Sequence, residues 1–386
     1  MRRRPLALAL AALTAAAASG TAGALRTTDP LQPQEWYLGA VGADQATPPG
    51  AGVPLTILDS GVDATQPDFA GRPATTYLNA QTTSGAGEFH GTEVASVAAA
   101  PANGTGIVGV YPQAALDVWD ATPTPGGLTS ATVAAGLAAA PCPGVVNISF
   151  GTVSRDPVVD AAVAAAQRRG CLLVAAAGNL ATQGNPVVYP AADPHVLAVG
   201  ASDEAGAPTP FTATGAWVDL FAPGVGIEVD TTLEHDPSGH VTDGGTSFSS
   251  AIVAAAAAWV WTARPKLSAA QVFALLKGTV QSGILNIPAA LAAPSPPNDS
   301  REPNDTVAEA RLLPALTTKA HPSARIAGTL DAVKDPRDLY RIFVPPHKRV
   351  RLTVRGPVVA RVVGSYVQVT LRGVASGAYV LSVTSG

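Results

Sequence analysis

The chain has 386 residues, of which 47% are apolar and only 13% carry a charge, and its formal net charge is −4. This composition excludes intrinsic disorder, because disordered chains are poor in apolar residues and rich in charge. The length allows a large buried core and a second domain, and the acidic balance leads us to expect no nucleic-acid partner.

The first residues combine a basic, an apolar and a small-residue segment in that order. Arg2, Arg3 and Arg4 precede an apolar run over residues 5–18, and small residues follow at 22–24. This order is typical of a signal peptide, which we place at residues 1–24, so we expect secretion. The run is too short for a resident membrane helix and no other stretch is long and apolar enough, so we expect no transmembrane anchor.

Residues 25–293 alternate apolar strand-like runs with alanine-rich helical runs. We expect strands at 54–58, 145–150, 172–177 and 196–199, and helices at 90–100, 157–169 and 249–262. Gly170 and Pro265 stand where two of these helices should end. Strands that alternate with helices predict an α/β fold, in which helices cover both faces of a mostly parallel sheet.

Only two cysteines occur, Cys142 and Cys171, and each stands just before a predicted buried strand. Neighbouring parallel strands would bring both sulfur atoms to the same end of the sheet. In an exported protein this favours one disulfide, with two buried free thiols as the alternative.

The sequence changes character at residue 294. Residues 294–299 read Pro-Ser-Pro-Pro-Asn-Asp, which suits an extended linker. Beyond it, apolar residues alternate with polar ones, as at Val350, Leu352 and Val354, so we expect residues 300–386 to form a small antiparallel β domain. The formal charge is −11 for residues 1–300 and +7 for residues 301–386, so the net value hides two parts of opposite sign.

Three polar residues stand where elements of the first domain begin or end. Asp59 follows a predicted strand, His90 opens a predicted helix, and Ser247 precedes a buried one. A serine hydroxyl becomes a good nucleophile when a base takes its proton, and an acid holds that base in the right tautomer. Alone, each residue would be read as a turn residue, a helix-start residue or an N-cap. All three residues occur in the same domain, each at the end or start of a predicted element, so coincidence is a poor explanation.

The motifs around these residues resemble those of the subtilisin-like serine peptidases, over residues 29 to about 292. Leu55–Gly61, His90–Ala95 and Gly245–Ser247 are similar to the family's Asp, His and Ser motifs and stand in the family's order. The resemblance implies a three-layer subtilisin-like fold and a secreted serine endopeptidase. Peptide bonds would then be hydrolysed through an acyl-enzyme on Ser247, with His90 as general base and Asp59 orienting it.

Asn179 ends a run, Ala175–Asn179, that is similar to the family strand leading to the oxyanion hole. An amide donor, together with the backbone N–H of Ser247, can stabilise the oxyanion without adding a competing base. A turn-forming asparagine is the alternative. The resemblance also implies substrate-binding positions at Ser149, Phe150, Gly151, Gly126, Gly127, Ala177, Gly178 and Val188.

These positions imply how a substrate would bind. The cleft edges would hold an extended peptide by backbone hydrogen bonds. Val188 falls near where many relatives have glycine at the base of the first pocket, so we expect small or medium apolar residues before the scissile bond.

No cofactor is required for this chemistry, but the resemblance extends to a structural calcium site. Asp68 and the loop over residues 101–107, which includes Asn103, match a family cation site in position and length. A solvated Asn-Gly turn is the alternative.

The sequence also departs from the family pattern. Ala251 and Ile252 replace a usual Pro-His pair after the nucleophile, and Glu93 replaces a frequent histidine, which changes the surroundings of the triad but removes no catalytic group. No prodomain is expected between residues 24 and 59, because residues 29–43 already resemble the start of the catalytic domain.

The β domain resembles the bacterial pre-peptidase C-terminal domain. The matching segments are residues 301–306, 328–330 and 338–343. Its arginines at 349, 351, 355 and 372 could lie on solvated strand faces. We expect them either to dock on the acidic peptidase domain or to contact anionic cell-envelope material, with simple solubility as the alternative.

Two rival functions remain at this point. An esterase of the α/β-hydrolase type would need a Gly-x-Ser-x-Gly elbow and the order Ser, Asp, His, which the chain lacks. A catalytically inactive binding protein on the same fold would not need all four catalytic groups, which the chain has.

Overall fold

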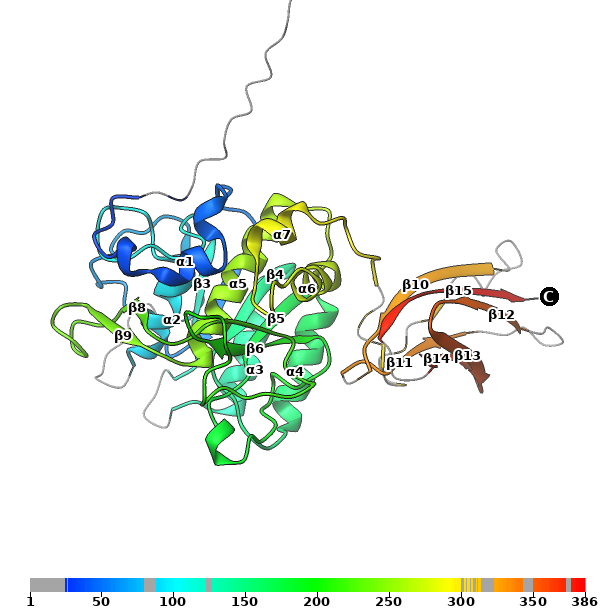
Figure 1. The fold of residues 1–386 in the computed structure, drawn as a ribbon. Helices are drawn as coiled ribbons and strands as arrows, with labels where there is room; N and C mark the ends of the chain where they lie inside the picture. Colours follow the sequence, from blue (N-terminus) through cyan, green and yellow to red (C-terminus); the bar gives the residue numbers. More distant parts are fainter. Residues whose placement is uncertain are drawn as a thin grey trace, which may run out of the picture.

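The computed structural model describes two units, a larger one built on a parallel sheet and a smaller one built on antiparallel sheets (Figure 1). The described residues are 25, 27–79, 88–122, 127–299, 302, 304–305, 307, 310, 312–313, 323–332, 334–342, 350–372 and 376–385. The expected signal peptide at 1–24 therefore lies outside them.

The first unit is built on one seven-stranded sheet with the order β2-β3-β1-β4-β5-β6-β7. All neighbouring strands of this sheet pair in parallel. The strands are β1 (Leu55–Asp59), β2 (Thr75–Tyr77), β3 (Leu116–Asp120), β4 (Gly144–Ile148), β5 (Cys171–Ala176), β6 (Val196–Ser202) and β7 (Leu220–Pro223). The predicted parallel sheet is confirmed.

Helices cover both faces of this sheet. One face packs on α2 (His90–Ala99), α5 (Thr246–Ala263), α6 (Ala269–Gly278) and α7 (Ile287–Ala292), and the other on α3 (Ser130–Ala139) and α4 (Pro157–Arg168). The alternation of a strand divides its side chains between the two cores, as Ile57 and Leu58 show. Helix α1 (Trp36–Ala40) and three single-turn 3-10 helices, at Gln32–Gln34, Ala43–Gln45 and Ala181–Gln183, complete the unit.

Helix α5 runs through the middle of this unit. Residues 248–261 are all buried, and the run of alanines lets α2 and strands β4 to β7 approach it closely. Within the described part of the chain, α5 alone has the length and apolar composition of a membrane span, and 83% of it is buried inside the protein. It is the core helix of this unit.

A two-stranded antiparallel hairpin, β8 (Ile227–Asp230) and β9 (His240–Asp243), precedes α5. It packs against α2, so it covers the helix that His90 begins.

The second unit contains two three-stranded antiparallel sheets. One has the order β10 (Ser323–Leu330), β15 (Gly377–Ser385), β12 (Val350–Arg355), and the other β11 (Arg337–Arg341), β14 (Tyr366–Leu371), β13 (Val358–Val363). The two sheets share a core that includes Tyr340, Val367 and Leu381. Along β12, Val350, Leu352 and Val354 are half-buried and the residues between them are exposed, which confirms the expected alternation.

Cys142 and Cys171 form a disulfide, with their Cα atoms 5.0 Å apart. This confirms the predicted disulfide over the alternative of two free thiols. Gly144 of β4 pairs with Cys171 of β5, so the bond closes the start of two neighbouring parallel strands.

Helix α5 begins at Thr246, three residues before the expected start. Its N-cap residue, Gly245, has no side chain that could cap the helix. The side chain of Asn179 takes this role, because its Oδ1 accepts the backbone N–H of Thr246 at 3.0 Å. Ser247 therefore stands inside the first turn of the helix.

Candidate active site

The three residues of the expected triad lie at the carboxyl edge of the parallel sheet, where sites form in such folds. Asp59 is the last residue of β1, His90 is the first residue of α2 and Ser247 is the second residue of α5. The Asp59 side chain is 5% exposed, and its Oδ1 lies 2.8 Å from Nδ1 of His90. The same oxygen accepts the backbone N–H of Ser60 at 2.8 Å, so two contacts fix the carboxylate.

The first turn of α5, which carries Ser247, approaches His90. The ring of Phe248, the next residue, is 6.3 Å from the imidazole between centroids. Among the described contacts, the Ser247 hydroxyl donates to the backbone oxygen of Ser149 at 3.1 Å and not to His90. A hydrogen bond between a nucleophile and its base is often long or absent until substrate binds.

The side chain of Asn179 is oriented by Thr246. Its Oδ1 accepts the backbone N–H of Thr246 at 3.0 Å and the hydroxyl of Thr246 at 2.9 Å. Since a backbone N–H can only donate, the first contact assigns the oxygen and directs Nδ2 away from Thr246. Asn179 and Ser247 both line the cleft described next.

A cleft of about 290 Å³ opens beside Ser247. The residues that line it are Ser149, Phe150, Gly151, Thr152, Val153, Ala176, Gly178, Asn179, Leu180, Val188, Thr246 and Ser247. The expected substrate positions on residues 149–151, 178 and 188 therefore meet in one place. Ala177 is fully buried behind the cleft, Gly127 is half-buried and is not part of its lining, and Gly126 lies outside the described residues.

Val188 occupies the space between two glycines of the cleft wall. A Cβ atom on Gly151 would lie 2.5 Å from Cγ1 of Val188, and one on Gly178 would lie 2.8 Å from its Cγ2. Only residues without a side chain fit at 151 and 178, because Val188 fills the gap between them. The valine thus limits the depth of the cleft.

The charge of Asp59 changes the acidity of His90. Burial by itself would lower the pKa of His90, but the charge and hydrogen bond of Asp59, helped by the charge of Glu93, raise it to about 9. Glu93 lies one turn further along α2, is fully buried and accepts a hydrogen bond from the Thr231 hydroxyl at 2.9 Å. The neighbouring carboxylates therefore favour the protonated form of the imidazole.

The expected cation ligands Asp68 and Asn103 lie near each other, but their side chains have different partners. Nδ2 of Asn103 donates to the backbone oxygen of Asp68 at 3.0 Å, and its Oδ1 accepts the N–H of Thr105 at 2.8 Å. The carboxylate of Asp68 accepts the N–H of Ile107 at 3.2 Å through Oδ2.

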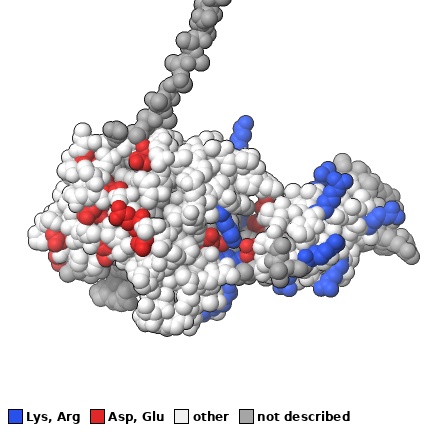
Figure 2. All heavy atoms as spheres, viewed as in Figure 1, with Lys and Arg blue, Asp and Glu red and all other residues white. Residues whose placement is uncertain are grey.

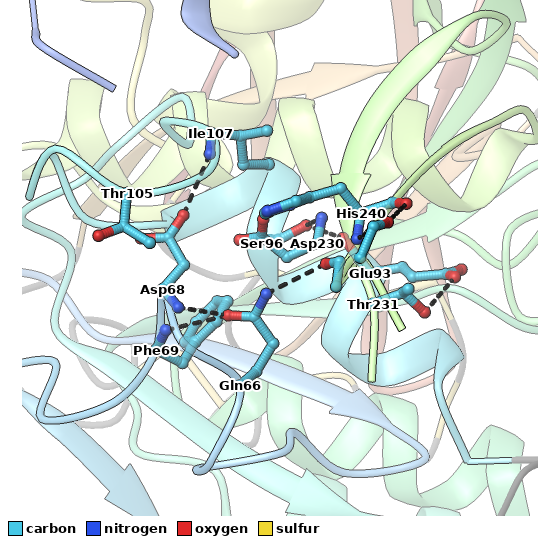
Figure 3. Close-up of polar contacts among 12 residues, drawn as sticks. Gln66, Asp68, Phe69, Glu93, Ser96, Thr105, Ile107, Asp230, Thr231 and His240 are labelled. Carbon is cyan, nitrogen blue, oxygen red and sulfur yellow. Dashed lines mark hydrogen bonds and ion pairs between the residues drawn. The ribbon is translucent and has the colours of Figure 1, made fainter. Parts of the chain in front are cut away.

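Asp68 also faces a second carboxylate, which sequence reasoning missed. A Cβ atom on Gly106 would lie 2.7 Å from Oδ2 of Asp68 and 2.9 Å from Oδ1 of Asp230, which pairs with Nδ1 of His240 at 2.8 Å (Figure 3). Asp68 and Asp230 are fully buried, and each has one oxygen without a donor. Burial and the charge of Asp230 raise the pKa of Asp68 to about 9. Oxygens of this kind fit a hard cation.

Two other groups of side chains have the spacing of metal ligands within the described ranges. One is His195, Glu302, Asp305 and Asp335, and the other is Asp299, Glu302 and Asp338. Nε2 of His195 lies 3.1 Å from Glu302 and 3.0 Å from Asp305, so the imidazole is a cationic partner for the first group when it is protonated. Burial disfavours that charge, but the charge of Glu302 and the hydrogen bonds of both carboxylates raise the pKa of His195 well above its usual value.

Residues 50–307 match the subtilase family. The chain belongs to the subtilase family. This subtilase is 34% identical to Subtilisin Savinase of Lederbergia lenta over 235 residues, which are 60% of the chain and 85% of the relative. It is 33% identical to Subtilisin DY of Bacillus licheniformis over 255 residues, which are 62% of the chain and 91% of the relative.

Among solved structures, the subtilase is similar to one described as S41 Psychrophilic Protease. The TM-score is 0.54 at 24% identity, over 64% of this chain and 90% of that chain, which supports the fold. Family membership makes the chain a serine-type endopeptidase that acts on polypeptides and needs no cofactor for catalysis.

Some residues of the subtilase's site were not foreseen from the sequence. Thr246 stands in the Gly-Thr-Ser motif, but its role in orienting Asn179 depends on two segments 67 residues apart. Asp230 and His240 lie on a hairpin with no motif of its own.

Proposed function

We propose that this endopeptidase works through Asp59, His90, Ser247 and Asn179. The Ser247 oxygen attacks the peptide carbonyl while its proton passes to Nε2 of His90, and Asp59 stabilises the imidazolium. Nδ2 of Asn179 and the N–H of Ser247 donate to the oxyanion. The intermediate collapses to an acyl-enzyme as His90 gives its proton to the leaving amine. Water, deprotonated by His90, then attacks the ester; the bond to Ser247 breaks, His90 returns the proton to the serine oxygen, and the acid leaves.

The observation that carries this proposal is the 2.8 Å contact between Asp59 and His90, whose ring is approached by Phe248, the residue after Ser247. The test is a serine-directed fluorophosphonate probe with peptide mapping, together with casein hydrolysis by Ser247→Ala. Labelling on Ser247 and loss of hydrolysis in the variant are expected. Labelling of another serine would favour an esterase arrangement, and unchanged hydrolysis by Ser247→Ala would overturn the mechanism.

Substrates bind, in this proposal, as an extended strand along residues 149–151 and 126–127. Val188 closes the base of the first pocket between Gly151 and Gly178, which leaves too little depth for a phenyl ring. This supports small or medium apolar residues before the scissile bond.

A structural calcium ion is part of the same proposal. Asp68 would supply a carboxylate oxygen, and the loop that contains Asn103 would supply carbonyls. The donor-free buried oxygen of Asp68 supports it. The ion would add stability and take no part in the reaction.

The cellular location and the domain division of the enzyme are proposed from the sequence. Residues 1–24 would direct export, residues 25–293 would form the peptidase domain, residues 294–299 the linker and residues 300–386 a domain of the pre-peptidase C-terminal type. Arg351, Arg355 and Arg372 are exposed, and blue atoms gather on the β domain in Figure 2 while red atoms gather on the far side of the peptidase domain. This separation supports contact with anionic envelope material.

A further inference from the structure

One turn connects the substrate cleft to the β domain. It starts at Val188 in the cleft wall, where Tyr189 forms a two-way backbone bridge with Thr152. It ends where β6 begins at Val196. Contacts that hold residues 191–196 in place are therefore only a few residues along the chain from Val188 at the base of the cleft.

Lys334 of the β domain reaches into this turn. It lies between β10 and β11, and its side chain is only 4% exposed. Its Nζ donates to the backbone oxygens of Ala191 at 3.0 Å and Val196 at 2.7 Å, and to Oδ2 of Asp219 at 2.6 Å. An ammonium group has three N–H bonds, and each one finds an acceptor on the peptidase domain. Lys334 thus ties Ala191 and Val196, in the second part of the turn, to the buried carboxylate of Asp219.

His195, inside the same turn, makes the reciprocal contact. Its backbone has a φ of +58°, in the left-handed region that few residues other than glycine adopt. In this conformation Nε2 reaches Glu302 and Asp305 on the β-domain side. A conformation of this kind persists where surrounding contacts hold it, and here those contacts come from the β domain.

Inside the peptidase domain, the turn leads directly to the pocket. Asp193 pairs with Arg155, whose guanidinium lies 4.6 Å above the ring of Tyr189, the residue after Val188. Arg155 thus links the turn to Tyr189 by a second route besides the backbone.

A cavity lies between the two units, beside the contacts of Lys334. Its volume is about 590 Å³, with Leu172, Phe273 and Leu330 in its walls. Where the apolar surfaces are separated by this cavity, polar contacts such as those of Lys334 and His195 join the two units.

We propose that Lys334 is a positioning residue for the peptidase: by holding the turn from Ala191 to Val196, the β domain sets the place of Val188 and thereby the selectivity of the first substrate pocket. The proposal rests on the proposed function, because it assumes that the cleft beside Ser247 is the substrate site. The β domain would then contribute to the substrate selectivity of the peptidase domain.

The test compares Lys334→Met with Lys277→Met in the full-length enzyme, with intact mass confirming that the β domain is present. Lys277 is the matched control: its Nζ binds the same Asp219 at 2.9 Å and Asp331 at 3.0 Å, but it makes no contact with the turn. The readouts are kcat and KM for two peptides that differ only in Ala or Phe before the scissile bond, and hydrogen exchange of residues 188–196. Scattering distances report whether the units stay docked.

In Lys334→Met we expect the preference for Ala over Phe to fall on the order of tenfold, and exchange across 188–196 to rise. Lys277→Met should leave both within about twofold of the parent enzyme. Equal changes in the two variants would show a docking role alone and overturn the proposal, as would an unchanged preference in Lys334→Met. If Lys334→Met does not fold, Lys334→Gln, which keeps an amide donor for the two carbonyls, is judged by the same criteria. Probe labelling of Ser247 in the parent enzyme is measured alongside, and its failure would count against the proposed function instead.

Discussion

Asn179 and Thr246 form a two-point contact in which one amide oxygen accepts both the backbone N–H and the hydroxyl of the threonine. The contact orients the amide nitrogen and caps the helix that presents Ser247. A donor held in place before the reaction stabilises the oxyanion without the cost of reorganising solvent.

Asn179→Ala should reduce kcat on the order of a hundredfold, the known size for one oxyanion donor in this family, with little change in KM. Thr246→Val is a milder change, because it removes the hydroxyl and keeps the backbone contact to Asn179. We expect a smaller reduction of kcat, about tenfold. Steady-state kinetics on one peptide substrate measures both. A larger loss in Thr246→Val than in Asn179→Ala would contradict this order.

The raised pKa of His90 predicts activity that increases toward alkaline pH. A general base must be neutral to accept a proton, and the Asp59 charge holds the pKa of His90 at about 9, so kcat/KM should rise with pH through that value. Glu93→Gln removes a negative charge near His90 and should move the midpoint to lower pH. The measurement is kcat/KM from about pH 6 to 10. A profile already flat at about pH 7 would show that His90 has its ordinary pKa.

Val188→Gly should deepen the first pocket. Removing the side chain that fills the gap between Gly151 and Gly178 makes room for a ring, so kcat/KM for Phe relative to Ala should rise about tenfold. Val187→Gly is the control, because Val187 is 40% exposed and does not line the cleft. A parent enzyme that already prefers aromatic residues would refute the assigned role of Val188.

If calcium binds at Asp68, chelation should lower Tm, because an ion that binds only the folded state adds stability. Asp68→Asn should lower Tm in calcium and abolish most of the further shift on chelation. The variant also separates this site from the carboxylates around Glu302, whose response it would leave in place. A chelation shift of parental size in Asp68→Asn would place the ion elsewhere.

The exposed arginines of the β domain predict salt-dependent retention on anionic envelope material. Replacing Arg351 and Arg355 together by glutamine should reduce retention at low salt, and salt should weaken the parent's binding because exposed charges are screened beyond roughly 8 Å at physiological ionic strength. Lys266→Gln, an exposed change on the peptidase domain, is the control. Retention that does not depend on salt would leave solubility as the role of these arginines.

The sheet, the main helices and the disulfide could be predicted because their signals are local. Val145 and Leu172 lie in apolar runs of strand length, and Cys142 and Cys171 flank those runs. Short strands such as β2, with three residues and no buried position, have no comparable pattern and were missed.

The partners of buried charges could not be predicted in the same way. Asp68 meets Asp230 across 162 residues of sequence, and nothing in the hairpin's sequence indicates which carboxylate it faces. Lys334 stands in a polar loop, where a lysine is normally solvated, and only the packing of the two units shows that it is buried. Patterns of this kind encode which residues are apolar, whereas the pairing of polar groups depends on the assembled geometry.

The core position of α5 has a consequence for how this enzyme loses activity. Ser247 belongs to a helix that is enclosed along residues 248–261, so the nucleophile has no loop of its own that can loosen while the rest of the domain stays folded. Heat should therefore remove the serine's reactivity only when the whole peptidase core opens, in one cooperative event. Below that temperature, the enzyme should lose activity by self-digestion of its exposed segments sooner than by local unfolding around Ser247.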